Sequence, residues 1–283
     1  MKYVFFGTPE FAAIILRKLI DASFFPIAVV CNPDRPAGRK KVITKPPAKI
    51  IAEKHHIPVL QPEKLDLGFV LHLSSFKPDF SIVAAYAKIL PKDCVEMPRL
   101  GTIGVHPSLL PKYRGASPIQ SAILNGETET GVALYLLDEK MDHGPMLKNG
   151  KLKIENSDTY ETLMRKLAEL GGDLLAETIP KFLAGEIKPQ AQDEREATFT
   201  KKFTTEDGRV DAHDLEAALT GEDRKKAVRI ERKIRALNPE PGAWTIQNGK
   251  RVKLLFAEIE NGKLKLKKIQ TEGKKPITLK NGK

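Results

Sequence analysis

Cysteines and long apolar runs are nearly absent from this sequence, and both shortages exclude classes of protein. The 283 residues include two cysteines, Cys31 and Cys94, too few for a disulfide framework or a zinc site. We therefore expect buried thiols in a reducing compartment. No apolar run approaches the ~18 residues that cross a bilayer, and the strand-like run 2–6 is too short for a signal peptide. The sequence thus indicates a cytoplasmic globular protein with no membrane-spanning part.

Several common catalytic motifs are also missing. Gly7 stands alone before Thr8 and Pro9, so the G-x-G-x-x-G fingerprint of dinucleotide binding is absent. There is no P-loop and no G-x-S-x-G elbow. His55 and His56 are adjacent on an expected helix, where neighbours do not share a face, so we expect no metal site. The sequence therefore argues against nicotinamide, phosphoryl-transfer and serine-hydrolase chemistry.

The last sixty residues are strongly basic, whereas the rest of the chain is nearly neutral. Residues 224–283 hold 18 Lys and Arg against 5 Asp and Glu, a net +13, and the remaining 223 residues carry −2. Basic and apolar residues alternate at 251–254 and 263–267, which predicts strands with one basic face. This asymmetry favours nucleic acid as a partner, although a solvated sheet face would show the same alternation. Aromatic residues are sparse there (Trp244, Phe256), so we expect contacts to the nucleic-acid backbone rather than base stacking.

Strands and helices alternate in the first part of the chain, which is typical of a parallel α/β sheet. Strands are expected at 2–6, 27–31, 59–60, 80–84, 101–106, 130–137 and 146–154, and a long helix at 159–183. The polar segment after residue 184 lacks apolar periodicity and indicates a linker. After this linker, a helix at 227–237 and short strands with Asn-Gly turns predict a small barrel. We therefore expect a first domain at 1–184, a linker at 185–203 and a second domain at 204–283.

His106 and Asp142 are the best candidates for acid–base chemistry. His106 closes one expected strand, and Asp142 lies in the turn 141–144 beyond another. Ligands of α/β proteins bind at the carboxyl ends of strands, where both residues are expected. A carboxylate beside a histidine orients the ring and supports its protonated form. The spacing alone equally fits a purely structural pair.

Several motifs resemble those of the folate-dependent formyltransferases. The central ones are His106-Pro-Ser-Leu-Leu-Pro-Lys-Tyr-Arg-Gly115, Pro118-Ile119, Thr130-Gly-Val132 and Met141-Asp-His-Gly144. Those similar to the tRNA-directed branch of the family are Phe5–Phe11, Asp34–Arg39 and Arg232–Ala243. The motifs occur in order and cover nearly the whole chain, so together they are very specific.

The resemblance implies a Rossmann-like, mostly parallel sheet domain followed by a small OB-like β-barrel. It also implies transfer of a formyl group from 10-formyltetrahydrofolate, a co-substrate, to the amino group of methionyl-tRNA, the charged initiator tRNA. His106 and Asp142 would then be catalytic, with no metal required. We expect a monomer, because no heptad pattern or long apolar stripe indicates a dimer.

The same resemblance assigns binding residues. The folate would contact the loop after His106, at Ser108, Leu109, Leu110 and Pro111, and a segment with Tyr86, Ala87, Ile89 and Leu90. The tRNA would contact the loop 34–47 through Arg39, Lys40 and Lys41. In the second domain it would contact Arg232, Lys233, Arg235, Arg251 and Lys253.

One position departs from the family pattern. The family has asparagine two residues before the histidine, and its side chain holds the formyl oxygen, whereas this chain has Gly104 there. Loss of one oxyanion donor typically costs a factor of about 10²–10³ in rate. Another donor could substitute, the enzyme could be slow, or the protein could bind folate without catalysis. A second departure is the end of the chain at Lys283, which is shorter than is typical of the family.

Two rival functions remain open. Relatives that formylate a small nucleotide-linked amino sugar, or that hydrolyse formyltetrahydrofolate, share the central motifs, but a small substrate gives no reason for the basic second domain. A catalytically weakened folate- and RNA-binding protein would agree with Gly104. Salt dependence of binding separates the first rival from a tRNA enzyme, and product formation on charged tRNA separates the second.

Overall fold

The computed structural model describes residues 1–38 and 41–279, and these divide into two compact units. The first unit comprises Met1–Arg114, Thr130–Lys153 and Met164–Phe199. The second comprises Gly115–Glu129, Ile154–Leu163 and Thr200–Lys283. Two short stretches that precede residue 184 in the sequence therefore group with the second unit. None of the helices in the described residues is long and apolar enough to cross a membrane.

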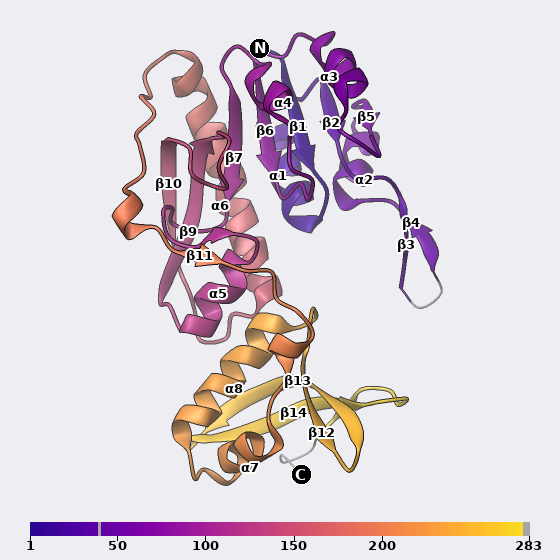
Figure 1. Cartoon of the computed structure of the whole chain (residues 1–283), viewed down its shortest axis with the longest axis vertical. Coiled ribbons are helices and arrows are strands. Elements are labelled where there is room, and N and C mark those ends of the chain that lie inside the picture. Colours follow the sequence, from indigo (N-terminus) through magenta and orange to yellow (C-terminus); the bar gives the residue numbers. More distant parts are fainter. Residues whose placement is uncertain (39–40, 280–283) are drawn as a thin grey trace. The chain divides into compact units, whose positions relative to one another are not determined.

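The first unit is built on a seven-stranded sheet (Figure 1) with the order β10-β9-β7-β6-β1-β2-β5. Its strands are β1 (Tyr3–Gly7), β2 (Ala28–Val30), β5 (Val59–Leu60), β6 (Phe80–Ala84), β7 (Thr102–His106), β9 (Glu129–Leu136) and β10 (Met146–Lys153). The pairs β1–β2, β2–β5, β1–β6 and β6–β7 are parallel, whereas β9 runs antiparallel to β7. The predicted Rossmann-like, mostly parallel α/β fold is confirmed.

Helices lie on both faces of this sheet, which is why β1 is buried along its whole length. The helices of this part of the chain are α1 (Glu10–Asp21), α2 (Pro47–Lys54), α3 (Leu67–Ser74), α4 (Lys92–Glu96) and α6 (Tyr160–Leu183). On one face, Val4 and Phe6 form a buried cluster with Leu73 of α3. On the other face, Gly171 of α6 lies close to Val105 of β7 and Ile15 of α1. Along β7 the side chains alternate between the two faces, so Gly104 and His106 share the face opposite to that of Val105.

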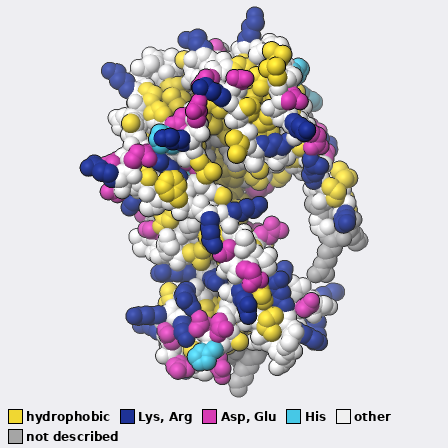
Figure 2. All heavy atoms as spheres, viewed as in Figure 1, with side chains coloured by type: hydrophobic (Ala, Val, Ile, Leu, Met, Phe, Trp, Pro, Cys, Tyr) yellow, Lys and Arg dark blue, Asp and Glu magenta, His cyan; other side chains and the backbone are white. Residues whose placement is uncertain are grey.

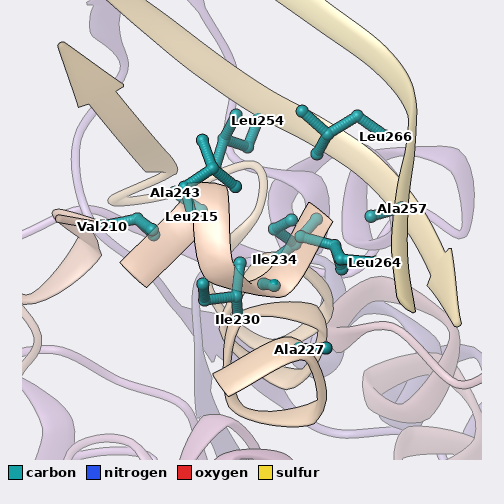
Figure 3. Packing of buried hydrophobic residues seen from close by; sticks show 11 residues of the cluster. Val210, Leu215, Ala227, Ile230, Ile234, Ala243, Leu254, Ala257, Leu264 and Leu266 are labelled. Carbon is teal, nitrogen blue, oxygen red and sulfur yellow. The ribbon is translucent and has the colours of Figure 1, made fainter. Parts of the chain in front are cut away.

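The second unit pairs helices with a four-stranded antiparallel sheet of order β12-β13-β14-β15. Its elements are α5 (Pro118–Asn125), α7 (Ala212–Thr220), α8 (Arg224–Leu237), β12 (Ala243–Gln247), β13 (Lys250–Glu260), β14 (Lys263–Thr271) and β15 (Ile277–Thr278). Val252, Leu254, Leu264 and Leu266 are buried, and the three leucines pack with Ile230 and Ile234 of α8 (Figure 3), so the predicted apolar strand face is confirmed. Helix α7 was not predicted from the sequence. Asp211 caps its N-terminus, and the Asp211 carboxylate accepts hydrogen bonds from the backbone amides of His213 and Asp214.

The segments predicted as loop and linker carry structure of their own. Within 34–47, β3 (Arg35–Ala37) and β4 (Val42–Thr44) form an antiparallel hairpin. Residues 185–203 contain a 3₁₀ turn, η1 (Glu194–Glu196), and the strand β11 (Phe199–Thr200), which pairs with β8 (Arg114–Gly115). A second 3₁₀ turn, η2 (Glu206–Gly208), precedes α7. Residues 185–199 therefore belong to the first unit. Their contacts with it could not be predicted from the polarity of the segment or from its lack of an apolar period.

Candidate active site

The ends of three adjacent parallel strands meet at one edge of the first unit's sheet. The neighbouring strands β7, β6 and β1 are parallel, so their carboxyl ends lie at the same edge of the sheet. His106 is the last residue of β7, the segment 86–90 follows β6, and Gly7 ends β1. Strand order therefore brings together the predicted folate segment and the predicted catalytic histidine.

His106 and Asp142 are neighbours, as predicted. Nδ1 of His106 lies 3.5 Å from Oδ2 of Asp142, and the side chains are 8% and 16% exposed. Nε2 of His106 lies 2.9 Å from the backbone carbonyl oxygen of Tyr113. Because a carbonyl only accepts hydrogen bonds, Nε2 carries the hydrogen in this contact. Both ring nitrogens of His106 therefore face oxygen atoms, and the carboxylate of Asp142 lies within ion-pair distance of Nδ1.

The turn that carries Asp142 is held from two sides. Asp142 has a φ of +50°, a left-handed conformation that needs support in a residue other than glycine. The hydroxyl of Tyr135 on β9 donates to Oδ1 of Asp142 at 2.6 Å. The amide of Gln192, from the segment 185–203, donates to the backbone carbonyls of Asp142 (3.0 Å) and Gly144 (2.8 Å). Side chain and backbone of Asp142 are therefore fixed by different partners.

The space beside Gly104 is filled by a tyrosine ring. Gly104 of β7 lies directly opposite Tyr135 of β9 in the antiparallel register. A Cβ atom at residue 104 would lie 2.4 Å from Cε1 of Tyr135, so no side chain fits there while the ring stays in place. The missing asparagine is visible in the sequence, but the place of Tyr135 is not, because the pairing register of two strands thirty residues apart leaves no sequence pattern.

The loop after His106 is rigid and partly apolar. Ser108 is buried, and its hydroxyl donates to the carbonyl of Lys112 at 2.6 Å. Leu110 is buried next to Tyr135, whereas Leu109 and Pro111 are half-buried. Of these four predicted folate contacts, Leu109 and Pro111 thus keep exposed surface.

The segment after β6 has features that fit a planar, partly apolar ligand. Ile89 is 91% exposed and Ala87 is exposed, whereas Leu90 packs against the cluster that contains Tyr86. The Tyr86 ring contacts Phe6 edge-on, and among the described residues its buried hydroxyl has no hydrogen-bond partner. Burial raises the pKa of Tyr86 to about 12, so this hydroxyl stays a donor. Because this hydroxyl is buried, Ala87 and Ile89 rather than Tyr86 present exposed surface to a ligand.

The structure separates the predicted tRNA-contacting residues into two groups. Arg235 is only 10% exposed and contacts Glu231 and the carbonyl of Asp158, and Lys233 donates to the carbonyl of Arg209 at 2.8 Å. Burial lowers the pKa of Lys233. Arg232 lies against Gly126, which ends α5. These three side chains have structural partners within the second unit.

Arg251 and Lys253 lie on the outer face of β13. The guanidinium of Arg251 stacks 4.0 Å from the ring centre of Trp244, and Arg209 approaches the same ring at 5.8 Å. Lys253 is exposed and pairs in register with Trp244 and Gln270, neither of which is acidic. We call Arg209, Trp244, Arg251 and Lys253 the tryptophan cluster.

Elsewhere the basic alternation is compensated by acidic residues. Lys263 and Lys265 lie opposite Glu260 and Glu258 in the register of β13 and β14, and Lys267 contacts both glutamates. On the face drawn in Figure 2, Lys and Arg side chains are interspersed with Asp and Glu. In the loop 34–47, Lys41 lies in the turn between β3 and β4, whereas Arg39 and Lys40 are outside the described residues.

In the described part of the chain, one group of residues has the composition of a metal site. Ligand atoms of Asp211, His213 and Asp214 lie within 4.8 Å of one another. However, Asp211 caps α7, and Asp214 pairs with Lys226 at 2.8 Å and with Arg229. These contacts already explain the cluster.

Comparison with known proteins places these observations in a family. The Formyl transferase family model matches residues 1–179, and the model of the Formyl transferase C-terminal domain matches residues 224–264. The chain belongs to the formyltransferase family.

Individual relatives are consistent with this assignment. A methionyl-tRNA formyltransferase of Halalkalibacterium halodurans is 46% identical over 259 residues, which is 91% of this chain and 78% of the relative. Among solved structures, methionyl-tRNA formyltransferase from Clostridium thermocellum is similar with a TM-score of 0.62 at 17% identity, over 96% of this chain and 98% of that one. HypX from Aquifex aeolicus in complex with tetrahydrofolic acid is similar with a TM-score of 0.66 at 20% identity, over 99% of this chain and 46% of that one.

Proposed function

We propose that this protein transfers the formyl group of 10-formyltetrahydrofolate to the free amino group of methionyl-tRNA. The observation that carries the proposal is the His106–Asp142 pair at the carboxyl end of β7, next to the segment 86–90. The similarity to methionyl-tRNA formyltransferases over most of the chain supports the same substrate pair. Because charged tRNA is its substrate, we expect the protein to act in the cytoplasm, as a monomer.

The reaction needs a proton acceptor and a stabilised oxyanion. The amine attacks the formyl carbon to give a tetrahedral intermediate, and the ring nitrogen of neutral His106 that carries no hydrogen accepts the proton that the amine nitrogen loses. The resulting imidazolium donates from Nδ1 to Asp142 and from Nε2 to the carbonyl of Tyr113, the two acceptors at these atoms. The bond between the formyl carbon and N10 then breaks as N10 takes the proton held by the His106 imidazolium, which releases tetrahydrofolate and formyl-methionyl-tRNA and returns His106 to its neutral form.

The folate is proposed to lie along the exposed residues of two loops. Ala87 and Ile89 offer apolar contact and the backbone of 86–90 offers polar groups, whereas the buried Tyr86 supports the segment from the cluster that it shares with Leu90. Leu109 and Pro111 would contact it from the loop after His106. In this proposed arrangement the formyl group would lie at the strand end where His106 is found.

Formation of formylated product tests the proposed function directly. The native protein is incubated with 10-formyltetrahydrofolate and methionyl-tRNA, and the aminoacyl end is analysed by mass spectrometry. We expect N-formylmethionine, and no formylation of a nucleotide-linked amino sugar under the same conditions. Binding of tRNA without product, or formylation of the amino sugar alone, would contradict the proposal.

The tryptophan cluster is the proposed contact with the phosphate backbone of the tRNA. Binding through phosphates releases counterions, so affinity should fall steeply between about 50 and 200 mM salt, linearly on logarithmic axes. Replacing Lys253 by glutamine should weaken tRNA binding and reduce this slope by about 1. Nitrocellulose filter binding across a salt series measures both quantities.

Lys265→Gln is the matched control for this test. Lys265 lies on the same outer face, but its partner in the register is the acidic Glu258, whereas the partners of Lys253 are Trp244 and Gln270. We therefore expect a smaller change in the salt slope for Lys265→Gln than for Lys253→Gln. Equal effects of the two substitutions would contradict the assignment of the contact to the tryptophan cluster.

A further inference from the structure

We propose that Tyr135 is a positioning residue of the formyl-transfer reaction, which occupies the space over Gly104 and holds Asp142 in the orientation that faces His106. This inference rests on the proposed function and goes beyond it, because it assigns a role to a residue outside the motifs that identify the family. The ring position, the hydrogen bond and the shared sheet face support it.

The ring of Tyr135 and the missing side chain at residue 104 depend on each other. The two residues are a cross-strand pair of β7 and β9, and such partners lie close together on one face of the sheet. A Cβ atom at residue 104 would lie 2.4 Å from Cε1 and 2.6 Å from Cζ of Tyr135, and also 2.6 Å from Cδ1 of Leu137, so the tyrosine ring is the main but not the sole obstacle. The side chain of His106 is on the same face of β7. The phenol thus lies in the region beside His106 where the family has its asparagine.

The hydroxyl of Tyr135 acts as a donor to Asp142. Tyr135 is 6% exposed, and burial together with the charge of Asp142 raises its pKa well above the usual range. The neutral phenol keeps its hydrogen, and the 2.6 Å bond to Oδ1 is a charge-assisted hydrogen bond to a carboxylate. Because Oδ1 is held, rotation of the carboxylate is restricted and Oδ2 remains directed at Nδ1 of His106.

The hydroxyl does not replace the asparagine as an oxyanion donor. A phenol has one hydrogen, and Asp142 already accepts it. Its contribution is therefore indirect: an oriented carboxylate supports the imidazolium, which carries the positive charge next to the developing oxyanion. In this chain the cation of His106, rather than an amide at residue 104, would stabilise that charge.

A double-mutant cycle in kcat tests the role of the hydroxyl. Tyr135→Phe keeps the ring and removes the hydrogen bond, so we expect kcat to fall about tenfold, while KM for the folate changes less than about twofold. Asp142→Ala removes the acceptor. In that background the same Tyr135→Phe change should alter kcat less than about twofold, because no carboxylate remains to be positioned.

Additivity of the two changes is the result that would overturn this role. If Tyr135→Phe lowers kcat equally in both backgrounds, the tyrosine acts only through general packing. An active native protein whose Tyr135→Phe variant has unchanged kcat would overturn the role of Tyr135 and leave the proposed function intact. A native protein without transferase activity would instead overturn the proposed function.

A second cycle tests the placement of the ring through stability. Gly104→Asn alone should lower the melting temperature, because its Cβ collides with the Tyr135 ring and with Cδ1 of Leu137. In the Tyr135→Ala background the same substitution should lower the melting temperature less, because the ring is gone and only the end of the Leu137 side chain has to move. A Gly104→Asn single variant as stable and active as the native protein would overturn the inference.

Discussion

Replacing His106 by alanine is expected to lower kcat for formyl transfer by about 10³-fold, because positioned acid–base groups contribute about 10²–10⁴. The imidazole is the group at the end of β7 placed to take the proton of the attacking amine, and both of its nitrogens face acceptors. Alanine leaves Asp142 and the loop 107–111 in place, so folate binding should change little. Single-turnover formation of formyl-methionyl-tRNA, followed by quenched-flow sampling, measures the effect.

His143→Ala is a stringent control for this prediction. His143 follows Asp142 directly in the chain, yet its Nδ1 lies 2.5 Å from Oδ2 of Asp138 and its Nε2 3.5 Å from Glu194. We expect its replacement to lower kcat less than about tenfold. If the two alanine variants lose activity equally, His106 has no special role in proton transfer.

The site was partly predictable from the sequence because its main residues end strands. A strand that closes on His106, and a tight turn that contains Asp142, are local patterns, and parallel strand order brings such ends together. The fold class follows from the same alternation of strands and helices. These features depend on residues close together in the chain.

The remaining parts of the site depend on register and long-range contacts. Tyr135 faces Gly104 only because β9 runs antiparallel to β7 in one particular register, and a shift by one residue would place its ring on the other face. Gln192 reaches the turn of Asp142 from fifty residues away, out of a segment whose polarity indicated a linker. Neither contact leaves a pattern in the sequence.

Which basic residues have acidic neighbours also depends on the strand register. The alternation of lysines with leucines in β14 correctly predicted a basic outer face and a buried apolar one. It did not show that Glu258 and Glu260 of β13 lie opposite Lys265 and Lys263. The net charge of the region is a property of composition, but the position of the uncompensated charge near Trp244 requires the strand register.

Arg114→Ala is expected to lower the free energy of unfolding by about 3–5 kcal/mol, because the substitution leaves a large cavity and removes charged hydrogen bonds. Arg114 is the largest fully buried side chain among the described residues, at 2% exposed. Its guanidinium donates to both carboxylate oxygens of Glu194, at 2.6 and 3.0 Å, and to the side-chain oxygen of Gln192 at 2.7 Å. Equilibrium urea unfolding followed by circular dichroism measures the loss.

Arg195→Ala is the matched control, because Arg195 is 88% exposed and pairs with Asp193 on the surface. Such a pair contributes at most about 1 kcal/mol, so this variant should unfold almost like the native protein.

The Arg114 substitution should also lower kcat at temperatures where the variant is folded, since Gln192 joins the guanidinium to the carbonyls of Asp142 and Gly144. A stable Arg114→Ala variant with native kcat would show that the segment 185–199 does not support the catalytic turn. A destabilised variant with native kcat would show that the segment contributes to stability alone.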